Sequence, residues 1–150
     1  MDNKVEWSLP VVFHFSVKLG TSEVSFSEAS GLETSIETKE VRNGGDNSTT
    51  YHLPERIKFS ELVLKRGQVS ENDSFFSWCK QNMDIGTNSC TVVPQSIEVS
   101  LLNEENNPLA TWRFEGAYPF KWSFSTLDAM KNEISIETIS LKYWNMKRTK

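Results

Sequence analysis

The chain has 150 residues, 37% hydrophobic and 24% charged, so it is long enough to bury the core of one soluble folded domain. Its formal net charge of −4 argues against a protein held on nucleic acid by phosphate contacts. A charged start with no long apolar run after it predicts neither a signal peptide nor a stable membrane insertion, so we expect synthesis in the cytoplasm. Cys79 and Cys90 fit neither a disulfide framework nor a zinc pattern, and we expect both to be free thiols.

The first elements form a predicted hairpin. An N-terminal arm, residues 1–10, ends at Pro10, and apolar residues then occupy alternate positions from Val11 to Leu19, as in a half-buried strand. The turn at 20–22 leads into a short second strand from Glu23 to Phe26.

The next strand, from Glu33 to Arg42, is polar on both faces. Only Ile36 and Val41 are aliphatic, whereas a strand inside an ordinary sandwich alternates between apolar and polar residues. Two interpretations stay open: an exposed edge strand of a monomer, or a wall strand that lines a wet cavity and pairs its backbone with another subunit. The absence of Pro from residue 33 to residue 53 favours the second interpretation, because edge strands that stay unpaired usually carry a Pro or a bulge, or are short.

A stretch rich in Asn, Gly, Ser and Thr, from Asn43 to Leu53, ends at Pro54 and predicts a loop of about a dozen residues, a length typical of functional or disordered loops. A further strand spans 57–64, and its apolar phase slips near residues 60–61, where a bulge is expected.

One helix is expected after Ser70, with residues 70–73 as an approximate capping box. Phe75, Trp78, Cys79 and Met83 follow at helical spacing and would pack one face of the helix on a sheet.

The last third of the chain predicts a second hairpin, from Gln95 to Gly116, followed by an aromatic connector over 118–122. Residues 125–132 form a loop or one helical turn. The last strand, from Glu133 to Tyr143, changes its apolar face along its length, so either a bulge resets the phase or both faces are covered. The sum is a mainly β fold (α+β) with one packed helix, a two-sheet β-sandwich or partial barrel.

Candidate catalytic groups are sparse, and we predict no enzyme, no metal site and no cofactor. His14 and His52 lack a matched nucleophile or a metal-ligand spacing, so both are interpreted as surface residues. The acidic series Glu28, Glu33, Glu37 and Glu40 follows strand positions and is interpreted as a solvated face. The glycine-rich residues 43–46 precede no helix start of the kind that binds phosphate.

Several segments together resemble the phage tail tube protein family, which covers contractile phage tails and related injection systems. These segments are 26–32 (FSEASGL), 40–45 (EVRNGG), 62–67 (LVLKRG), Trp78, 117–122 (AYPFKW) and 132–139 (NEISIETI). The resemblance spans roughly residues 11–143. It implies two packed sheets and a helix in each subunit, hexameric rings with a continuous β-barrel lumen, and stacking of the rings into a rigid tube inside a contractile sheath.

The resemblance also implies roles for particular residues. The tube-wall strand would present Glu33, Ser35, Glu37, Lys39, Glu40 and Arg42. The loop toward a neighbouring ring or subunit would be Asn43, Gly44, Gly45, Asp46, Asn47, Ser48, Thr49 and Thr50. Core packing is expected of Phe26, Leu32, Trp78, Trp112, Pro119, Trp122 and Ile136. The chain would divide into the arm 1–10, a tail tube domain 11–144 and a basic C-terminal tail 145–150.

The partners that the resemblance implies are the sheath, the baseplate or tube-initiator and spike proteins, and a cargo or tape-measure protein in the lumen, with no specific nucleic-acid sequence. Alternatives are the secreted Hcp ring of type VI secretion, which shares the fold, and a tube-initiator ring, suggested by a C-terminus that departs from the family pattern. A monomeric carbohydrate-binding sandwich would need Trp7, Tyr118 and Trp122 exposed in a row.

Overall fold

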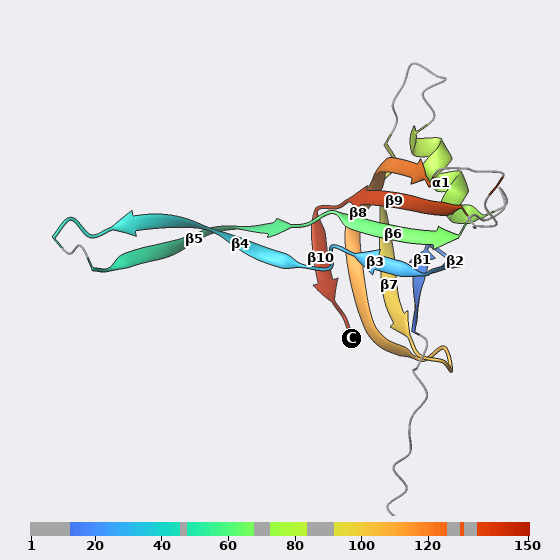
Figure 1. Ribbon diagram of the computed structural model, residues 1–150, viewed down its shortest axis with the longest axis horizontal. Helices are drawn as coiled ribbons and strands as arrows, with labels where there is room; N and C mark the ends of the chain where they lie inside the picture. The colour runs from blue at the N-terminus through green and yellow to red at the C-terminus, as the bar shows by residue number, and fades with distance from the viewer. Residues whose placement is uncertain (1–12, 46–47, 68–72, 84–91, 126–129, 131–134) are drawn as a thin grey trace, which may run out of the picture.

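The computed structural model describes residues 13–45, 48–67, 73–83, 92–125, 130 and 135–150 (Figure 1). Among these residues there are ten strands and one helix. In chain order they are β1 (His14–Leu19), β2 (Ser22–Phe26), β3 (Glu28–Ser30), β4 (Thr34–Arg42), β5 (Thr50–Phe59), β6 (Leu62–Gly67), α1 (Ser74–Met83), β7 (Gln95–Leu102), β8 (Pro108–Phe124), β9 (Ile136–Lys142) and β10 (Asn145–Arg148).

Eight strands belong to one antiparallel sheet in the order β2-β1-β7-β8-β9-β6-β3, with β10 also paired to β8. The long strand β8 pairs with β7 up to Ala117 and with β9 from Tyr118 onward. Gly116, with a φ of 66°, lies at this change of partner, where a residue with a side chain would be strained. The sheet therefore turns a corner along β8 and forms two facing layers, as the sequence predicted, without closing into a barrel.

The core lies between the two layers and under α1. Its fully buried members include Val17, Leu62, Leu64, Phe75, Ile97, Val99, Phe114, Ile139 and Leu141. Of the residues expected in the core, Phe26, Trp78 and Pro119 are buried, and Leu32, Trp112 and Trp122 are partly buried.

Ile136, also expected in the core, instead lies on the outer face with 47% of its surface exposed. The pairing of β9 with β6 is continuous from Ile136 to Leu141, so no bulge resets the phase between them. Glu137, Ile139 and Leu141 face the core, and side chains alternate along a strand, so Ile136 must point outward. The sequence did not reveal this alternation, because the inward position next to Ile136 is occupied by the polar Glu137.

The helix begins with Asp73 as its N-cap, whereas Ser70, the first residue of the expected capping box, lies outside the described residues. The Asp73 Oδ1 accepts a hydrogen bond from the Phe75 amide at 3.4 Å, and its backbone carbonyl accepts one from the Ser77 amide at 3.1 Å. At the other end, Asn82 accepts a 2.7 Å hydrogen bond from the Val93 amide, which fixes the helix to the segment before β7.

A buried ion cluster joins the start of α1 to the sheet. The Arg66 Nε donates to Glu137 at 2.7 Å, its guanidinium also pairs with Asp73, and it lies 5.0 Å from the ring centre of Phe26. Trp122 donates its indole N–H to Glu137 at 2.6 Å. Burial alone would lower the pKa of Arg66, but the hydrogen bonds and charges of the two carboxylates outweigh burial and raise that pKa.

Strands β4 and β5 form a separate two-stranded sheet that projects from the body (Figure 1). The long loop expected from Asn43 to Leu53 is therefore shorter, because β5 already begins at Thr50. Pro54 lies inside β5 opposite Thr38, where the register shifts after Glu37, and such an irregular site tolerates a residue without an N–H. The phase slip at residues 60–61 is the junction between two strands of different sheets, not a bulge.

Two other segments are more regular than expected. The aromatic connector over 118–122 is part of β8, and residues 145–148 of the expected basic tail form β10. Residues 1–12 and 131–134, which include the expected arm and the start of the last strand, lie outside the described residues. The division into arm, tube domain and tail stays a prediction.

Candidate assembly surface

The hairpin of β4 and β5 is almost entirely exposed. Among the described residues from Thr34 to Lys58, only Glu37 is half-buried. An isolated two-stranded ribbon is marginal in water, because it has no second layer on which to bury a face. Contacts beyond the pairing of β4 with β5 are therefore needed to hold the hairpin in one orientation.

The register divides the hairpin into two faces, because residues paired across two strands point to the same side. One side, the charged face, carries the pairs Ser35–Lys58, Glu37–Arg56, Lys39–Leu53 and Val41–Tyr51. The other, the opposite face, carries Thr34–Phe59, Ile36–Ile57, Thr38–Pro54, Glu40–His52 and Arg42–Thr50.

The opposite face has an apolar strip that the β4 sequence alone did not reveal. Ile36 and Ile57 are paired and expose 58% and 60% of their surfaces, and Pro54 extends the strip toward the tip. Sequence reasoning placed Pro54 and its preceding residues in a loop, so Ile57 was not recognised as the partner of Ile36. An exposed apolar strip on a long strand pair is typical of an interaction surface.

The charged face is held by ion pairs around Glu37. Its carboxylate pairs with Arg56 and lies 3.6 Å from the Lys58 Nζ. The hydrogen bond from Arg56, with the charges of both cations, lowers the pKa of Glu37. Because Arg56 and Lys58 are exposed and Glu37 is only half-buried, the pairs fix orientation more than they add stability.

The hairpin leaves the body through two short links that are bound to each other. Ser60 donates its hydroxyl to Glu33 at 2.5 Å, and Gly31, with a φ of 82°, passes the carbonyl of Glu61 so closely that a Cβ would lie 1.8 Å from that oxygen. Tyr143 from the segment after β9 donates a 2.6 Å hydrogen bond to the Ser60 carbonyl. These contacts hold the hairpin at a fixed angle to the body.

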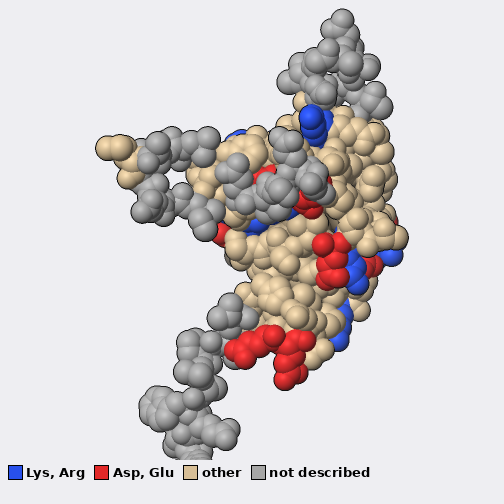
Figure 2. Space-filling view, turned by 90° about the vertical axis from the view of Figure 1, so that its right-hand side faces the viewer, with Lys and Arg blue, Asp and Glu red and all other residues tan. Residues whose placement is uncertain are grey.

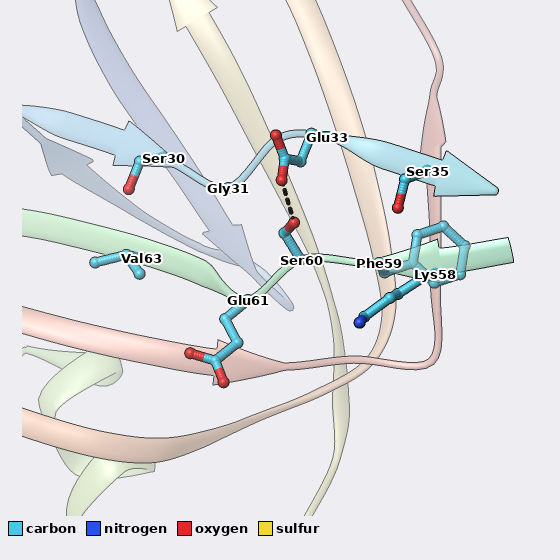
Figure 3. A pocket seen from close by; sticks show the side chains of 9 residues that line it. All are labelled: Ser30, Gly31, Glu33, Ser35, Lys58, Phe59, Ser60, Glu61 and Val63. Atoms are coloured by element: carbon cyan, nitrogen blue, oxygen red, sulfur yellow. Dashed lines mark hydrogen bonds between the residues drawn. The ribbon is translucent and has the colours of Figure 1, made fainter. Parts of the chain in front are cut away.

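An open groove of about 670 Å³ lies at these links (Figure 3). Ser30 and Val63 line it from the body, and Ser35 and Lys58 line it from the charged face. The outer surface of the layer β3-β6-β9 and the charged face of the hairpin therefore border one groove and run into each other.

The structure separates the residues that were expected to act together. Glu33, Ser35, Glu37 and Lys39 lie along the side of the groove and the charged face, whereas Glu40 and Arg42 lie on the opposite face. Of the expected contact loop, Asn43, Gly44, Gly45, Ser48 and Thr49 lie at the hairpin tip, Thr50 is in β5, and Asp46 and Asn47 lie outside the described residues.

Metal sites and membrane-spanning helices are absent from the described residues. No three of their His, Cys, Asp and Glu side chains gather as metal ligands would, and none of their helices is long and apolar enough to cross a membrane. His52 is exposed on β5 and His14 is half-buried on β1. Cys79 is a free, buried thiol, whereas Cys90 lies outside the described residues.

The chain is similar in fold to chains from contractile injection systems and to Hcp1. It is 26% identical, with a TM-score of 0.75, to a chain in the cryo-EM structure of the PVC sheath-tube complex, an extracellular contractile injection system in its extended state, covering 97% of this chain and 93% of that one. A chain in the anti-feeding prophage baseplate matches with the same identity and TM-score over 94% of both chains. Hcp1 from Flavobacterium johnsoniae has the same fold at 12% identity and a TM-score of 0.55, covering 91% of this chain and 94% of that one.

No sequence among the curated proteins matches the chain. The family model of the T4-like virus tail tube protein gp19, however, matches residues 11–147, which is nearly the whole chain. The resemblance found in the sequence, the two-layered fold with its projecting hairpin and this match agree. The chain belongs to the family of the T4-like virus tail tube protein gp19 and is a structural subunit of an inner tube.

Proposed function

We propose that this subunit assembles into hexameric rings that stack into a rigid channel for the delivery of cargo or DNA by a contractile injection system or phage tail. The sheath and the baseplate would be its partners, as suggested by the assemblies named for the similar structures, and the tube-initiator ring and the spike would be further partners, as the family resemblance implies. The subunit would act through its shape and stiffness. It would work as part of a phage-tail-like particle.

The observation that carries this proposal is the exposed hairpin with its apolar strip. Ile36 and Ile57 gain nothing in an isolated subunit, but burial of each in a neighbour would contribute on the order of 1 kcal/mol or more. A head-to-tail contact of this kind closes into a ring or extends along an axis, because donor and acceptor surfaces differ. The hairpin tip, residues 43–49, would contact the next ring or the next subunit.

The alternatives have weaker support. The likeness to Hcp1 is a likeness of fold, so a secreted ring that carries effectors stays the second candidate. A tube-initiator ring is the third. The carbohydrate-binding sandwich loses its basis, because Tyr118 and Trp122 are only partly exposed and the Trp122 N–H is already bound to Glu137.

Negative-stain electron microscopy of the purified protein at several concentrations tests the assembly. We expect rings or hollow tubes with six-fold end views. The double variant Ile36→Ser, Ile57→Ser should stay folded but remain a monomer, whereas Leu109→Ser, an exposed apolar residue away from the hairpin, should assemble normally. If the wild type stays monomeric even with a nucleating baseplate ring, or if the double variant forms normal tubes, the proposal fails.

Deletion of the tip separates stacking from ring closure. Replacing residues 43–49 by a two-residue turn should leave rings that no longer stack, because the paired strands β4 and β5 are kept. Tubes of normal length would show that the tip is not the contact between rings.

A further inference from the structure

The outer surface of one layer is polar and basic. In the pairs along β8, β9, β6 and β3, Lys121 lies opposite Ser140, and Lys65 lies opposite both Thr138 and Glu28. The residues that alternate with them, such as Leu64, are buried in the core, so these side chains point outward. Lys142 follows the buried Leu141 and is exposed on the same side.

The charged face of the hairpin continues this surface across the groove shown in Figure 3. We call the two together the basic surface. Among the described residues its cations are Lys39, Arg56, Lys58, Lys65, Lys121 and Lys142, and its carboxylates are Glu28, Glu33, Glu37 and Glu61. The cations outnumber the carboxylates although the whole chain carries a net charge of −4.

Acidic residues gather elsewhere. Figure 2 views the side away from the hairpin, where red side chains collect at the lower end of the molecule. That end of β7 and β8 is joined by a turn that carries the exposed Glu104 and Glu105. The charge of this subunit is therefore divided between its surfaces, and the basic surface has the sign opposite to that of the chain.

Most side chains between these charges are small and polar, and the exposed apolar exceptions are Val41, Tyr51 and Leu53 on the charged face and Ile136 on the outer face of β9. Ser30, Ser35, Ser123 and Thr138 lie among the lysines, and Val63 is an aliphatic residue in the middle of the surface. Such a surface offers hydrogen bonds and charge over most of its length, with large apolar side chains only toward the hairpin tip and at the start of β9, so it suits a mobile chain held by many weak contacts more than a rigid docked partner. Its cations alternate with carboxylates, so it offers no continuous row of positive charge for the closely spaced phosphates of a nucleic acid, whereas separate acidic side chains of a polypeptide can each lie opposite one cation.

We infer that the basic surface lines the channel and contacts a polypeptide cargo whose accessible side chains are mainly acidic. This inference rests on the proposed tube, since only closure of a ring turns the layer that continues into the hairpin toward an enclosed space. The attraction is spread over many weak exposed pairs, so the cargo is retained and still able to slide.

A matched pair of triple variants tests the inference. The first removes three lysines of the basic surface, Lys58→Gln, Lys121→Gln and Lys142→Gln. The control removes three exposed lysines from elsewhere, Lys18→Gln, Lys80→Gln and Lys147→Gln, so both variants have the same net charge. Thermal unfolding of both would establish that each is folded.

The measurement is retention of fluorescent oligoglutamate by assembled tubes in co-sedimentation. Tubes of the first variant should retain at least about threefold less oligoglutamate than wild-type tubes, and tubes of the control should retain as much as the wild type. Added salt should release the peptide. Equal retention by all three proteins, an equal loss in the control, or stronger retention of single-stranded DNA than of oligoglutamate would overturn the inference.

Amine labelling of the tubes tests the location separately. A small acylating reagent should enter the channel and modify Lys121 and Lys142. The same reagent attached to a polymer that is too wide for the channel should modify only outer lysines such as Lys18. Modification of Lys121 by both reagents would show that the basic surface does not line the channel. If no tubes form, the proposed function fails, and oligoglutamate binding to the soluble subunit still tests the charge preference.

Discussion

The phenol of Tyr143 donates a 2.6 Å hydrogen bond to the backbone carbonyl of Ser60, 83 positions away in the sequence. The same ring packs edge-on against Phe114, at 4.7 Å between centroids, and in a tilted orientation against Phe59, at 5.7 Å. Burial, with a smaller effect of the Glu33 charge, raises the pKa of this phenol, so it stays a donor at neutral pH. One side chain thus ties the root of the hairpin to the core.

Tyr143→Phe keeps the ring contacts and removes only the hydroxyl. We expect a loss of about 0.5–1.5 kcal/mol in the free energy of unfolding, because one partly buried hydrogen bond is lost. Urea denaturation with a tryptophan signal measures this loss. Unchanged stability would mean that water replaces the phenol at the Ser60 carbonyl.

Gly31→Ala should displace the hairpin. The backbone at Gly31 is left-handed, and the new Cβ would lie 1.8 Å from the Glu61 carbonyl oxygen, so one of the two links must move. We expect a loss of about 1–3 kcal/mol and a loss of tube assembly. Gly44→Ala, at a site with no atom within 4 Å in the subunit, is the control for stability and should leave the free energy of unfolding unchanged. Normal tubes from Gly31→Ala would contradict a fixed hairpin angle.

Arg66→Met should cost about 3–5 kcal/mol, because it leaves Glu137 and Asp73 buried without a cation. The control Arg113→Met breaks an exposed pair with Glu98, 3.8 Å apart, and should cost less than about 1 kcal/mol. The double variant Arg66→Met, Glu137→Gln should recover part of the loss, since it removes one uncompensated charge. Chemical denaturation compares the three, and equal losses for Arg66→Met and Arg113→Met would refute a buried cluster.

Cys79 should be unreactive in the folded protein. Burial, together with the Glu137 charge, raises the pKa of its thiol to about 12, far above the value of about 8.5 for an unfolded thiol. The neutral thiol therefore contributes stability that is fully present below pH of about 8.5 and declines as pH rises toward the folded value. Iodoacetamide labelling of a Cys90→Ser variant at pH 8, with and without urea, checks this. Fast labelling without urea would contradict the burial of the thiol.

The regular parts of the fold were predictable because their apolar residues follow one period. β1, β7 and α1 bury the residues that alternation or helical spacing selected, such as Val17, Val99 and Trp78. Prediction failed where a polar residue faces the core or an apolar one faces solvent. Glu137 and Ile136 exchange the usual roles in β9, because Arg66 provides a buried partner that lies 71 positions away.

The candidate surface was only half predictable for a related reason. The two-sided polar strand from Glu33 to Arg42 was identified, but its partner strand was hidden by Pro54, which is tolerated only because the register shifts beside it. Without β5 the apolar strip and the cations Arg56 and Lys58 could not be assigned to a face. Pairing across a hairpin is a property of the register, and sequence periodicity in one strand does not contain it.

The corner in β8 has a mechanical consequence. One covalent strand from Pro108 to Phe124 runs through both layers, so a thrust applied to either layer is transmitted along a continuous backbone and does not have to cross side-chain packing alone. The hydrogen bonds that β8 makes to β7 on one side of the corner, and to β9 on the other side, then share the applied force. In the proposed tube, this connection would resist shear between the two layers of each subunit when the tube is pushed from one end.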